Sequence, residues 1–258
     1  MRYCLIKRDD SFSEEVENSI AKKLEHDSFF SKDSIHPELV IVIGGDGTFL
    51  AALHHYMTHV DSLRFLCFNT GRIGYYNEFS ISDVDMALEG VKDGTLKTKS
   101  FPLLALNGEK ETHYAVNEFI VSGLLKNVEY DILLDGQFLE HYFGMGLVVS
   151  TTTGSMGYNR SIFGSILDTK LRAMELTEIA AIRSKAYQPI GSPVVIDGGR
   201  TLTFQEKNHR PATLLQDNLT FQKEADPVFT IQYGTKNAVC YVKDDDVFVP
   251  RLRKTLGY

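Results

Sequence analysis

The stretch ELVIVIGGDGTFLAALHHYM, residues 38–57, constrains the fold of this chain more than any other part of the sequence. Nearly unbroken apolar residues lead into Gly44, Gly45, Asp46 and Gly47, and apolar residues at helical spacing follow. This order predicts a buried strand, a glycine-rich turn and the start of an amphipathic helix. Ligands of open α/β sheets bind outside the carboxyl ends of the strands, so the turn is a candidate site.

The neighbouring segments extend this pattern. RYCLI and RFLCFN are strand-like, and helical patterns stand between the strand-like runs. In SFSEEVENSIAKKLEHD, Ser11 and Glu14 have the spacing of a capping box, and apolar residues recur every four positions after them. The alternation of strands and helices predicts a parallel sheet with crossover helices in the first part of the chain.

From residue 97 the pattern changes to successive strand-like runs with turn residues between them. Asp135-Gly136 and Asp217-Asn218 stand where two-residue hairpin turns are expected. One run, DTKLRAMELTEIAAI at residues 168–182, predicts a helix within this part. The second part of the chain is therefore expected to be mostly β.

Composition excludes several classes of protein. The formal net charge is −7 and the basic residues are scattered, so nucleic acid is not an expected partner. No apolar run approaches the ~20 residues that a membrane helix needs, and the apolar part of MRYCLIKRDD is too short for a secretory signal. We expect a cytoplasmic protein that makes no membrane contact. Cys4, Cys67 and Cys240 lie far apart in apolar stretches and are expected to be buried thiols.

Two interpretations of Asp46 follow from its setting. It can cap the helix, since Asp is a preferred N-cap residue. It can also stand beside bound phosphate, which the glycine backbone and the helix amides favour, and accept a hydroxyl proton or hold a metal through water. The two interpretations are compatible with each other. The chain contains neither G-x-x-x-x-G-K-[ST] nor G-x-G-x-x-G, so it lacks those two phosphate-binding motifs.

Two further stretches are unusual. In NEFIVSG, Asn117 and Glu118 are consecutive polar residues of a strand-like run, which indicates either a ligand contact or a bulge or edge position. In STTTGSMGYNRS, residues 150–161, hydroxyl-bearing and small residues follow a strand. Such a loop suits a sugar–phosphate ligand, although an ordinary hydroxyl-rich loop has the same composition.

Taken together, GGDGTFL, NTGRIGYYNEF, AVNEFIVSG, STTTGSMGYNRS, AMELTEIAAI, PIGSP and LLQDNLTF resemble, in order and spacing, the motifs of the NAD kinases over nearly the whole chain. GGDGT alone also occurs in diacylglycerol and sphingosine kinases, and a close variant occurs in phosphofructokinases, but those families do not resemble the remainder. The resemblance implies an α/β domain over residues 1–96, a β-rich dinucleotide-binding domain over residues 97–240, and a segment, residues 241–258, that returns to the first domain.

The resemblance also implies an activity. ATP, or in some members polyphosphate, would phosphorylate the 2′-hydroxyl of the adenosine ribose of NAD with Mg²⁺ and give NADP. Asp46 would orient or deprotonate that hydroxyl, and members assemble as dimers or tetramers. The implied phosphate loop consists of Gly44, Gly45, Gly47 and Thr48. The implied dinucleotide-binding residues, of which Ala180, Ile182 and Tyr187 would line pockets across a subunit interface, are Phe49, Tyr75, Asn117, Glu118, Met145, Ser155, Tyr158, Ser161, Ala180, Ile182, Tyr187, Asp217 and Asn218. The resemblance names no protein ligand for a metal.

Several positions depart from the pattern of that family. Met145 stands between two glycines where an aspartate is usual, Thr152 where a proline is usual, and Phe163 where a glycine is usual. Met156 and Gly157 replace a Thr-Ala pair. These departures bear on substrate affinity and cofactor preference. Two alternatives therefore remain at the level of sequence: a kinase of the same superfamily with a lipid or sugar acceptor, and a catalytically weakened sensor that binds dinucleotide.

Overall fold

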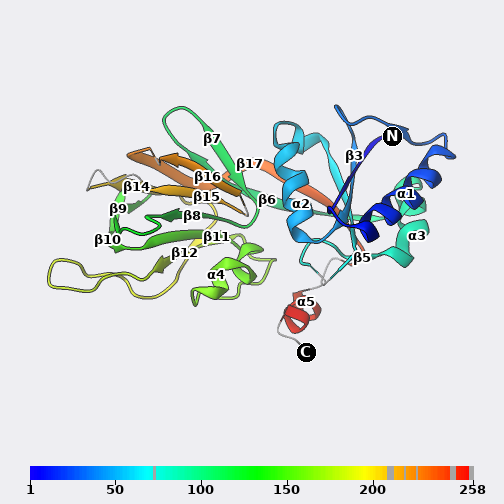
Figure 1. Ribbon diagram of the computed structural model, residues 1–258. Coiled ribbons are helices and arrows are strands. Elements are labelled where there is room, and N and C mark those ends of the chain that lie inside the picture. The colour runs from blue at the N-terminus through cyan, green and yellow to red at the C-terminus, as the bar shows by residue number, and fades with distance from the viewer. Residues whose placement is uncertain (72–73, 208–211, 218, 225, 245–247, 256–258) are drawn as a thin grey trace. The chain divides into compact units, whose positions relative to one another are not determined.

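The computed structural model describes residues 1–71, 74–207, 212–217, 219–224, 226–244 and 248–255. The chain forms two compact units, Met1–Phe101 together with Lys236–Tyr258, and Pro102–Thr235. Figure 1 follows the chain through both units by colour. The domain borders that the sequence predicts near residues 97 and 241 stay a prediction.

The first unit is built on a parallel sheet. Its parallel strands, in the order β2-β1-β3-β4, are β1 Arg2–Lys7, β2 Ser31–Lys32, β3 Leu39–Gly44 and β4 Arg64–Asn69. The short β5, Phe79–Ser80, pairs with β4, and the end of β17 pairs Cys240 with Phe65. The expected parallel α/β arrangement is confirmed.

Helices cover both faces of this sheet. They are α1 Ser11–Glu25, α2 Asp46–His55 and α3 Val84–Lys92, with the 3₁₀ helices η1 Met57–Ser62 and η2 Ile81–Asp83. Figure 1 shows α2 on one face and α1 and α3 on the other. Residues 39–43 of β3 are completely buried, as the unbroken apolar run predicts.

The start of α1 differs from its prediction. The N-cap is Asp10, whose Oδ1 accepts a hydrogen bond of 2.9 Å from the backbone N–H of Ser13, and Ser11 is the first helical residue. The capping box expected for Ser11 and Glu14 was therefore wrong, because the carboxylate one position earlier takes the free amide. The apolar stripe, Val16, Ile20 and Leu24, is buried as expected.

The second unit is built on antiparallel strands. One sheet, in the order β13-β12-β11-β8-β15-β16, contains β8 Glu118–Ser122, β11 Gly146–Thr151, β12 Ala173–Ile179, β13 Val194–Asp197, β15 Thr213–Gln216 and β16 Leu219–Glu224. The other strands are β9 Val128–Leu134, β10 Gln137–Gly144, β14 Leu202–Glu206 and β17 Val228–Val242, in the order β10-β9-β14-β17, and the hairpin of β6 Lys97–Asn107 with β7 Thr112–Ala115. Strands β6 and β17 carry the chain from one unit to the other.

One hydrophobic core joins the strands of the second unit. Phe119 and Val149 from the first sheet belong to the same buried cluster as Tyr130, Ile132 and Phe204 from β9 and β14. Such a core is typical of two sheets packed face to face. The mostly β character expected for this part is confirmed.

Two turns and one strand of this unit test finer predictions. Asp135 and Gly136 both have positive φ, 50° and 78°, which confirms the two-residue hairpin turn between β9 and β10. Asp217 also has a positive φ of 50°, while Asn218 lies outside the described residues. The helix predicted over 168–182 was wrong: Ala173–Ile179 form strand β12. Met174 and Leu176 face the hydrophobic core, which is the two-residue period of a strand.

The end of the chain returns to the first unit, as the resemblance implies. Helix α5, Phe248–Thr255, carries Arg251, which pairs with Glu78. The backbone N–H of Lys243 donates a hydrogen bond of 2.8 Å to Glu78 Oε2. One carboxylate thus holds two points of the returning segment.

Two predictions from composition are also tested. Cys4, Cys67 and Cys240 are free and buried, as expected. Within the described ranges, no helix is both long enough and apolar enough to cross a membrane.

Candidate active site

Asp46 is the first residue of α2, and its carboxylate faces another loop of the first unit. Its Oδ2 accepts a hydrogen bond of 2.6 Å from the backbone N–H of Tyr75, and its Oδ1 accepts one of 3.0 Å from that of Tyr76. The N-cap of α2 is Gly45, and no side chain caps the helix. The helix-cap interpretation of Asp46 is therefore wrong. The other interpretation, a role beside bound phosphate, stays a prediction.

The glycines around Asp46 have different reasons to be glycine. A Cβ on Gly74 would lie 2.1 Å from Asp46 Oδ1, so the carboxylate fits only because residue 74 has no side chain. A Cβ on Gly44 would lie 2.2 Å from Thr48 Oγ1, which fixes the turn against the helix. A Cβ on Gly45 would meet nothing within 4 Å. The backbone at Gly45 is thus open to an approaching group, while Gly44 serves packing.

Burial raises the pKa of Asp46 above its ordinary value. The two backbone N–H groups and the positive charge of Arg251 act in the opposite direction and offset part of that rise. A carboxylate with a raised pKa is a stronger proton acceptor than an exposed one, provided that it remains ionised at the working pH. The side chain therefore has the electrostatic setting of a general base.

The loop that holds Asp46 is itself fixed by packing. Tyr76 is buried and stacks on Phe49, with ring centroids 4.4 Å apart and an angle of 27° between the planes. Asn77 Nδ2 donates a hydrogen bond of 2.8 Å to the carbonyl oxygen of Gly44. The Arg251 guanidinium carbon lies 4.6 Å from the centre of the Tyr75 ring. Phe49, implied as a nucleotide contact, is completely buried in this packing.

In the second unit, Asp217 organises the Asn117-Glu118 pair. Its Oδ1 accepts backbone hydrogen bonds from Asn117 at 2.7 Å and from Glu118 at 3.2 Å, and its Oδ2 accepts one from Val116 at 3.2 Å. Glu118 begins β8, an inner strand between β11 and β15, so the edge or bulge interpretation was wrong. Asn117 directly precedes the strand.

Glu118 is the most unusual acid of this cluster. Its side chain is 5% exposed, and its Oε2 is buried with no hydrogen-bond partner in the described structure. Burial, and then the charge of Asp217, raise the pKa of Glu118 to about 8. A buried carboxyl group with an unused oxygen is a candidate for ligand binding, because native proteins rarely leave such atoms unpaired.

The hydroxyl-rich loop uses most of its hydroxyls internally. Thr151 Oγ1 and Thr153 Oγ1 donate to the carbonyl oxygen of Val116, at 2.7 and 3.0 Å. Ser155, which is completely buried, donates to the carbonyl oxygen of Thr152 at 2.7 Å and accepts from the backbone N–H of Leu167 at 3.1 Å. These contacts favour the interpretation as a structural loop for this part of the segment.

The end of the same segment offers exposed groups. Tyr158, 43% exposed, and Ser161 lie in the short helix α4, Tyr158–Ser161. The preceding turn is η3, Gly154–Met156. Tyr158 and Ser161 are therefore the members of this loop that remain accessible to a ligand.

Sequence reasoning missed the buried network beneath α4. Asn159 Nδ2 donates to Glu175 Oε2 at 2.9 Å, and Thr177 Oγ1 donates to Asn159 Oδ1 at 2.8 Å. All three side chains are buried. In AMELTEI, Glu175 and Thr177 alternate with apolar residues, which was the available indication of a strand. From the sequence alone, a helix is instead predicted for this run.

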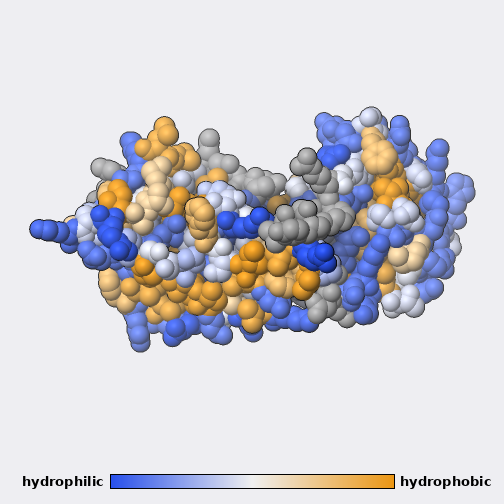
Figure 2. Space-filling view, turned by 90° about the horizontal axis from the view of Figure 1, so that it is seen from below, coloured by the Kyte–Doolittle hydropathy of each residue, from blue (hydrophilic) through white to orange (hydrophobic). Residues whose placement is uncertain are grey.

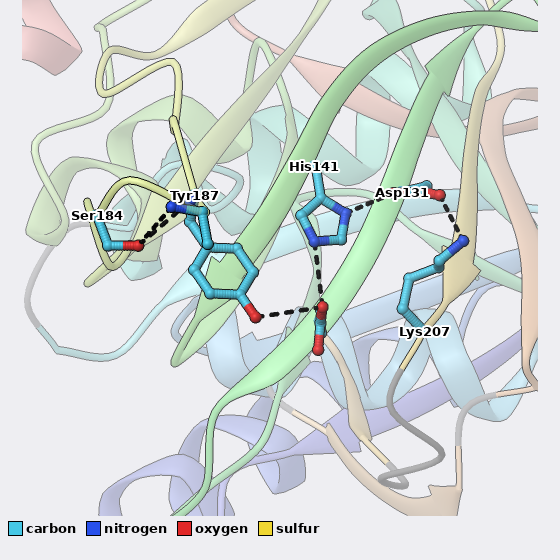
Figure 3. Close-up of polar contacts among 7 residues, drawn as sticks. Asp131, His141, Ser184, Tyr187 and Lys207 are labelled. Atoms are coloured by element: carbon cyan, nitrogen blue, oxygen red, sulfur yellow. Dashed lines mark hydrogen bonds and ion pairs between the residues drawn. The ribbon is translucent and has the colours of Figure 1, made fainter.

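Tyr187, one of the residues implied for the subunit interface, lies beside His141 of β10 (Figure 3). Its ring stacks on those of His141 and Phe143, at centroid distances of 5.4 and 4.6 Å. His141 lies between two carboxylates, with its Nδ1 2.6 Å from Asp131 Oδ1 and its Nε2 3.1 Å from Glu129 Oε1. The Tyr187 hydroxyl also reaches Glu129, at 3.5 Å. Tyr187 is thus held against the strand on several sides.

The other two residues implied for the subunit interface, Ala180 and Ile182, follow the end of β12 in the chain. Ala180 has a positive φ of 47°, and Ile182 donates its backbone N–H to the carbonyl oxygen of Phe143 at 2.8 Å. Met145 is half-buried and bonds through its backbone N–H to the carbonyl oxygen of Ile179 at 3.1 Å.

A cavity of about 310 Å³ in the second unit includes one position, Phe163, at which the chain departs from the motifs that it resembles. Its lining includes Phe163, Glu178 and Arg183. Phe163 is 92% exposed and has a positive φ of 65°, a conformation that costs little only for glycine. The positive φ of this residue therefore explains why glycine is usual at this position.

Within the described part of the chain, no group of three or more His, Cys, Asp or Glu side chains could hold a metal ion. Thr48 and Gly47 follow Asp46 in the first turn of α2, and Gly47 is exposed. The described site of the first unit thus consists of one half-buried carboxylate and an open glycine backbone.

This chain is similar to known proteins in sequence and in fold. A family model described as the ATP-NAD kinase N-terminal domain matches residues 7–96. Similar solved structures are yeast NADH kinase complexed with NADH, with TM-score 0.85, 17% identity and coverage of 100% of this chain and 88% of that chain, and an NAD kinase from Archaeoglobus fulgidus in complex with ATP, with TM-score 0.77, 21% identity and full coverage of both chains. These likenesses show the fold. An NAD kinase of Latilactobacillus sakei subsp. sakei (strain 23K) is 31% identical over 239 residues, which cover 90% of this chain and 88% of that protein. This chain belongs to the NAD kinase family.

Proposed function

We propose that the protein phosphorylates the 2′-hydroxyl of the adenosine ribose of NAD and releases NADP. The observation that carries this proposal is the half-buried carboxylate of Asp46, which two backbone amides hold at the carboxyl end of β3 beside the open backbone of Gly45. Relatives named NAD kinase support the same reaction and favour neither a lipid or sugar acceptor nor a sensor.

In this proposal Asp46 is the general base. The ribose 2′-oxygen forms a bond to the terminal phosphorus of the donor, the bond from that phosphorus to the bridging oxygen breaks, and the hydroxyl proton passes to the Asp46 carboxylate. Each carboxylate oxygen accepts one backbone hydrogen bond and retains a further lone pair for that proton. The two amides hold the carboxylate in one orientation, which lowers the cost of positioning it for the reaction.

The phosphate loop is proposed to consist of Gly44, Gly45, Gly47 and Thr48. ATP or polyphosphate is the proposed donor, and the similar Archaeoglobus fulgidus NAD kinase was solved in complex with ATP. Mg²⁺ is bound in many kinases mainly by substrate phosphates, with one or two carboxylates. The donor phosphates are the proposed ligands of such an ion, and the open backbone at Gly45 leaves room for a magnesium–phosphate donor. When bound, the ion would neutralise charge on the transferred phosphate.

The residues proposed to contact the dinucleotide are supported to different degrees. In the second unit, the support is strongest for Glu118, with its unpartnered oxygen, and for the exposed Tyr158 and Ser161. The further proposed contacts are Phe49, Tyr75, Asn117, Met145, Ser155, Ala180, Ile182, Tyr187, Asp217 and Asn218.

We further propose a cytoplasmic homodimer or homotetramer. Figure 2 shows hydrophobic side chains gathered on the surface of the second unit, at the left of the view. Exposed apolar side chains of that unit include Phe163, Ile166, Ile190 and Val195. An exposed apolar area of this kind supports contact between protein chains.

A single assay tests the activity. The purified protein is incubated with NAD, Mg²⁺ and either ATP or polyphosphate, and NADP is measured with an NADP-specific dehydrogenase. Formation of NADP with either donor supports the proposal. Absence of NADP with both donors, while calorimetry detects NAD binding, would favour the sensor alternative.

A further inference from the structure

We propose that Arg251, in the C-terminal helix, is a positioning residue for Asp46. It holds the segment 74–78, whose backbone amides hold the Asp46 carboxylate. This inference rests on the proposed role of Asp46 as the general base. It assigns the C-terminal helix a part in catalysis, although no residue of that helix is proposed to touch a substrate.

The segment 74–78 has anchors on two sides. Tyr76 packs against Phe49, and Asn77 bonds to Gly44, so one side is fixed to the β3–α2 turn itself. Tyr75 and Glu78 are the anchors on the other side, and both contact Arg251. Tyr75 supplies the shorter of the two amide hydrogen bonds to Asp46, 2.6 Å against 3.0 Å. The position of its amide therefore depends on the side that Arg251 holds.

The contacts of Arg251 are those of a buried, specific ion pair. The side chains of Arg251 and Glu78 are each 8% exposed, and Nη2 of the arginine pairs with Oε1 of Glu78. The planar guanidinium also lies against the Tyr75 ring, an arrangement that the ammonium group of lysine cannot reproduce. A buried charge of this kind is costly unless it is paired, which indicates that the pair has a role beyond general stability.

Arg251 also acts on Asp46 through its charge. Burial raises the pKa of Asp46, and the positive charge of Arg251 offsets part of that rise. Burial lowers the pKa of Arg251, while Tyr75, Tyr76 and Asp46 act in the opposite direction. The remaining titratable group that interacts electrostatically with Asp46 is the Cys67 thiol of β4. Burial raises the pKa of this thiol. Arg251 is thus the cation among the described neighbours that favours the ionised form of Asp46.

The test compares Arg251→Met with Arg253→Met in the purified full chain. Arg253 lies two positions away in the same helix and is exposed, so it is a matched control. In Arg251→Met we expect kcat to fall roughly tenfold to a hundredfold with little change in KM for NAD, because misplacing a catalytic group mainly affects the transition state. We also expect the acid limb of the kcat–pH profile to move to higher pH, since loss of the positive charge raises the pKa of Asp46. Arg253→Met should change neither.

Three further variants keep the test decisive. Arg251→Lys retains the charge but loses the planar contacts, so kcat should fall while the acid limb stays near its original position. If Arg251 acts through Asp46, adding Arg251→Met to Asp46→Asn should lower kcat little further. Glu78→Gln removes the paired charge and one of the two acceptor oxygens that Arg251 and the Lys243 amide use. It should lower kcat in the same direction and serves if Arg251→Met does not fold.

The opposite results would overturn the proposal. These are an Arg251→Met protein with a lower melting temperature but unchanged kcat and acid limb, or equal losses of kcat from Arg251→Met with and without Asp46→Asn. Failure of the proposed function is a separate result, because the unaltered protein would then form no NADP.

Discussion

The carboxylate of Asp217 accepts a hydrogen bond of 2.7 Å from the backbone N–H of Asn117, although the two residues are 100 positions apart in the sequence. The same carboxylate accepts from Glu118 and Val116, and the backbone N–H of Asp217 donates to the carbonyl oxygen of Glu118 at 3.0 Å. A carboxylate that accepts several amide hydrogen bonds fixes the local backbone firmly. Asp217 therefore orients the polar pair at the start of β8.

Replacing Asp217 by Asn should release this backbone. Asparagine has one acceptor oxygen, and its NH₂ group would face amide donors. We expect Asp217→Asn to lower the free energy of unfolding by about 1–3 kcal/mol, measured by urea unfolding, and to weaken NAD binding, measured by calorimetry. The control is Asp197→Asn, at an exposed turn where the carboxylate accepts from Gly199. An Asp217→Asn protein as stable as the control would contradict the anchoring role.

Glu118 should make stability depend on pH. Its pKa in the folded protein is raised from 4.5 to about 8, so the folded state binds more protons than the unfolded state between these values. The contribution of Glu118 to stability is therefore fully present below about pH 4.5 and is lost as the pH rises toward 8. Urea unfolding at several pH values across this range should show a shallower fall for Glu118→Gln than for the unaltered protein.

Glu140 will add to the same trend, because burial and the neighbouring Glu178 raise its pKa to about 8 as well. The comparison with Glu118→Gln isolates the part that belongs to Glu118. Glu15→Gln, at an exposed position of α1, is the control and should leave the pH dependence unchanged. A Glu118→Gln protein with the full original slope would show that Glu118 is ionised in the folded state throughout this range.

Asp46→Asn tests the proposed general base. The amide keeps the size of the side chain but cannot accept the hydroxyl proton, so kcat should fall by roughly a hundredfold or more, with a far smaller change in KM for NAD. Steady-state NADP formation provides both constants. Full turnover together with a lower melting temperature would leave Asp46 with a structural role only.

The sequence predicts the parts of the fold in which neighbouring residues decide the structure. The apolar run of β3 and the stripe of α1 are local patterns, and both are buried as expected. Strand β12 lies in the run for which the sequence predicts a helix, and Glu175 and Thr177 are polar residues of that strand. Both side chains are buried by a hydrogen-bond network with Asn159, whose existence depends on tertiary contacts.

The candidate site also combines residues that local sequence patterns indicate with residues that only the tertiary fold brings together. Asp46 stands out because three glycines surround it and the Gly-Gly-Asp-Gly segment follows a buried strand. Arg251 does not stand out in the sequence, because its partner Glu78 is 173 positions away and nothing in the sequence around residue 251 indicates burial. The resemblance implies Asp217 as a dinucleotide-binding residue, but nothing in the sequence indicates its hydrogen bond to Asn117.

Met145→Asp tests whether the chain has lost a ligand contact that its family usually makes. The backbone of Met145 is fixed by hydrogen bonds to Ile179 and from Gly123, so the substitution should leave the strands in place. If the aspartate regains one charge-assisted hydrogen bond, worth about 1.5–3 kcal/mol, the dissociation constant for NAD should fall by roughly tenfold or more. Calorimetric titration measures it. Unchanged or weaker binding with a lower melting temperature would assign Met145 to packing.

Phe163→Gly tests the backbone at the cavity. Phe163 has a φ of 65° and is 92% exposed, so the phenylalanine costs backbone energy and gains little packing within the chain. Replacement by glycine should raise the free energy of unfolding by about 1 kcal/mol in dilute protein, where urea unfolding measures it. If instead the variant is less stable, and the difference grows with protein concentration, Phe163 packs against another copy of the chain, because stability then depends on association. A less stable variant with no concentration dependence would contradict the backbone argument itself.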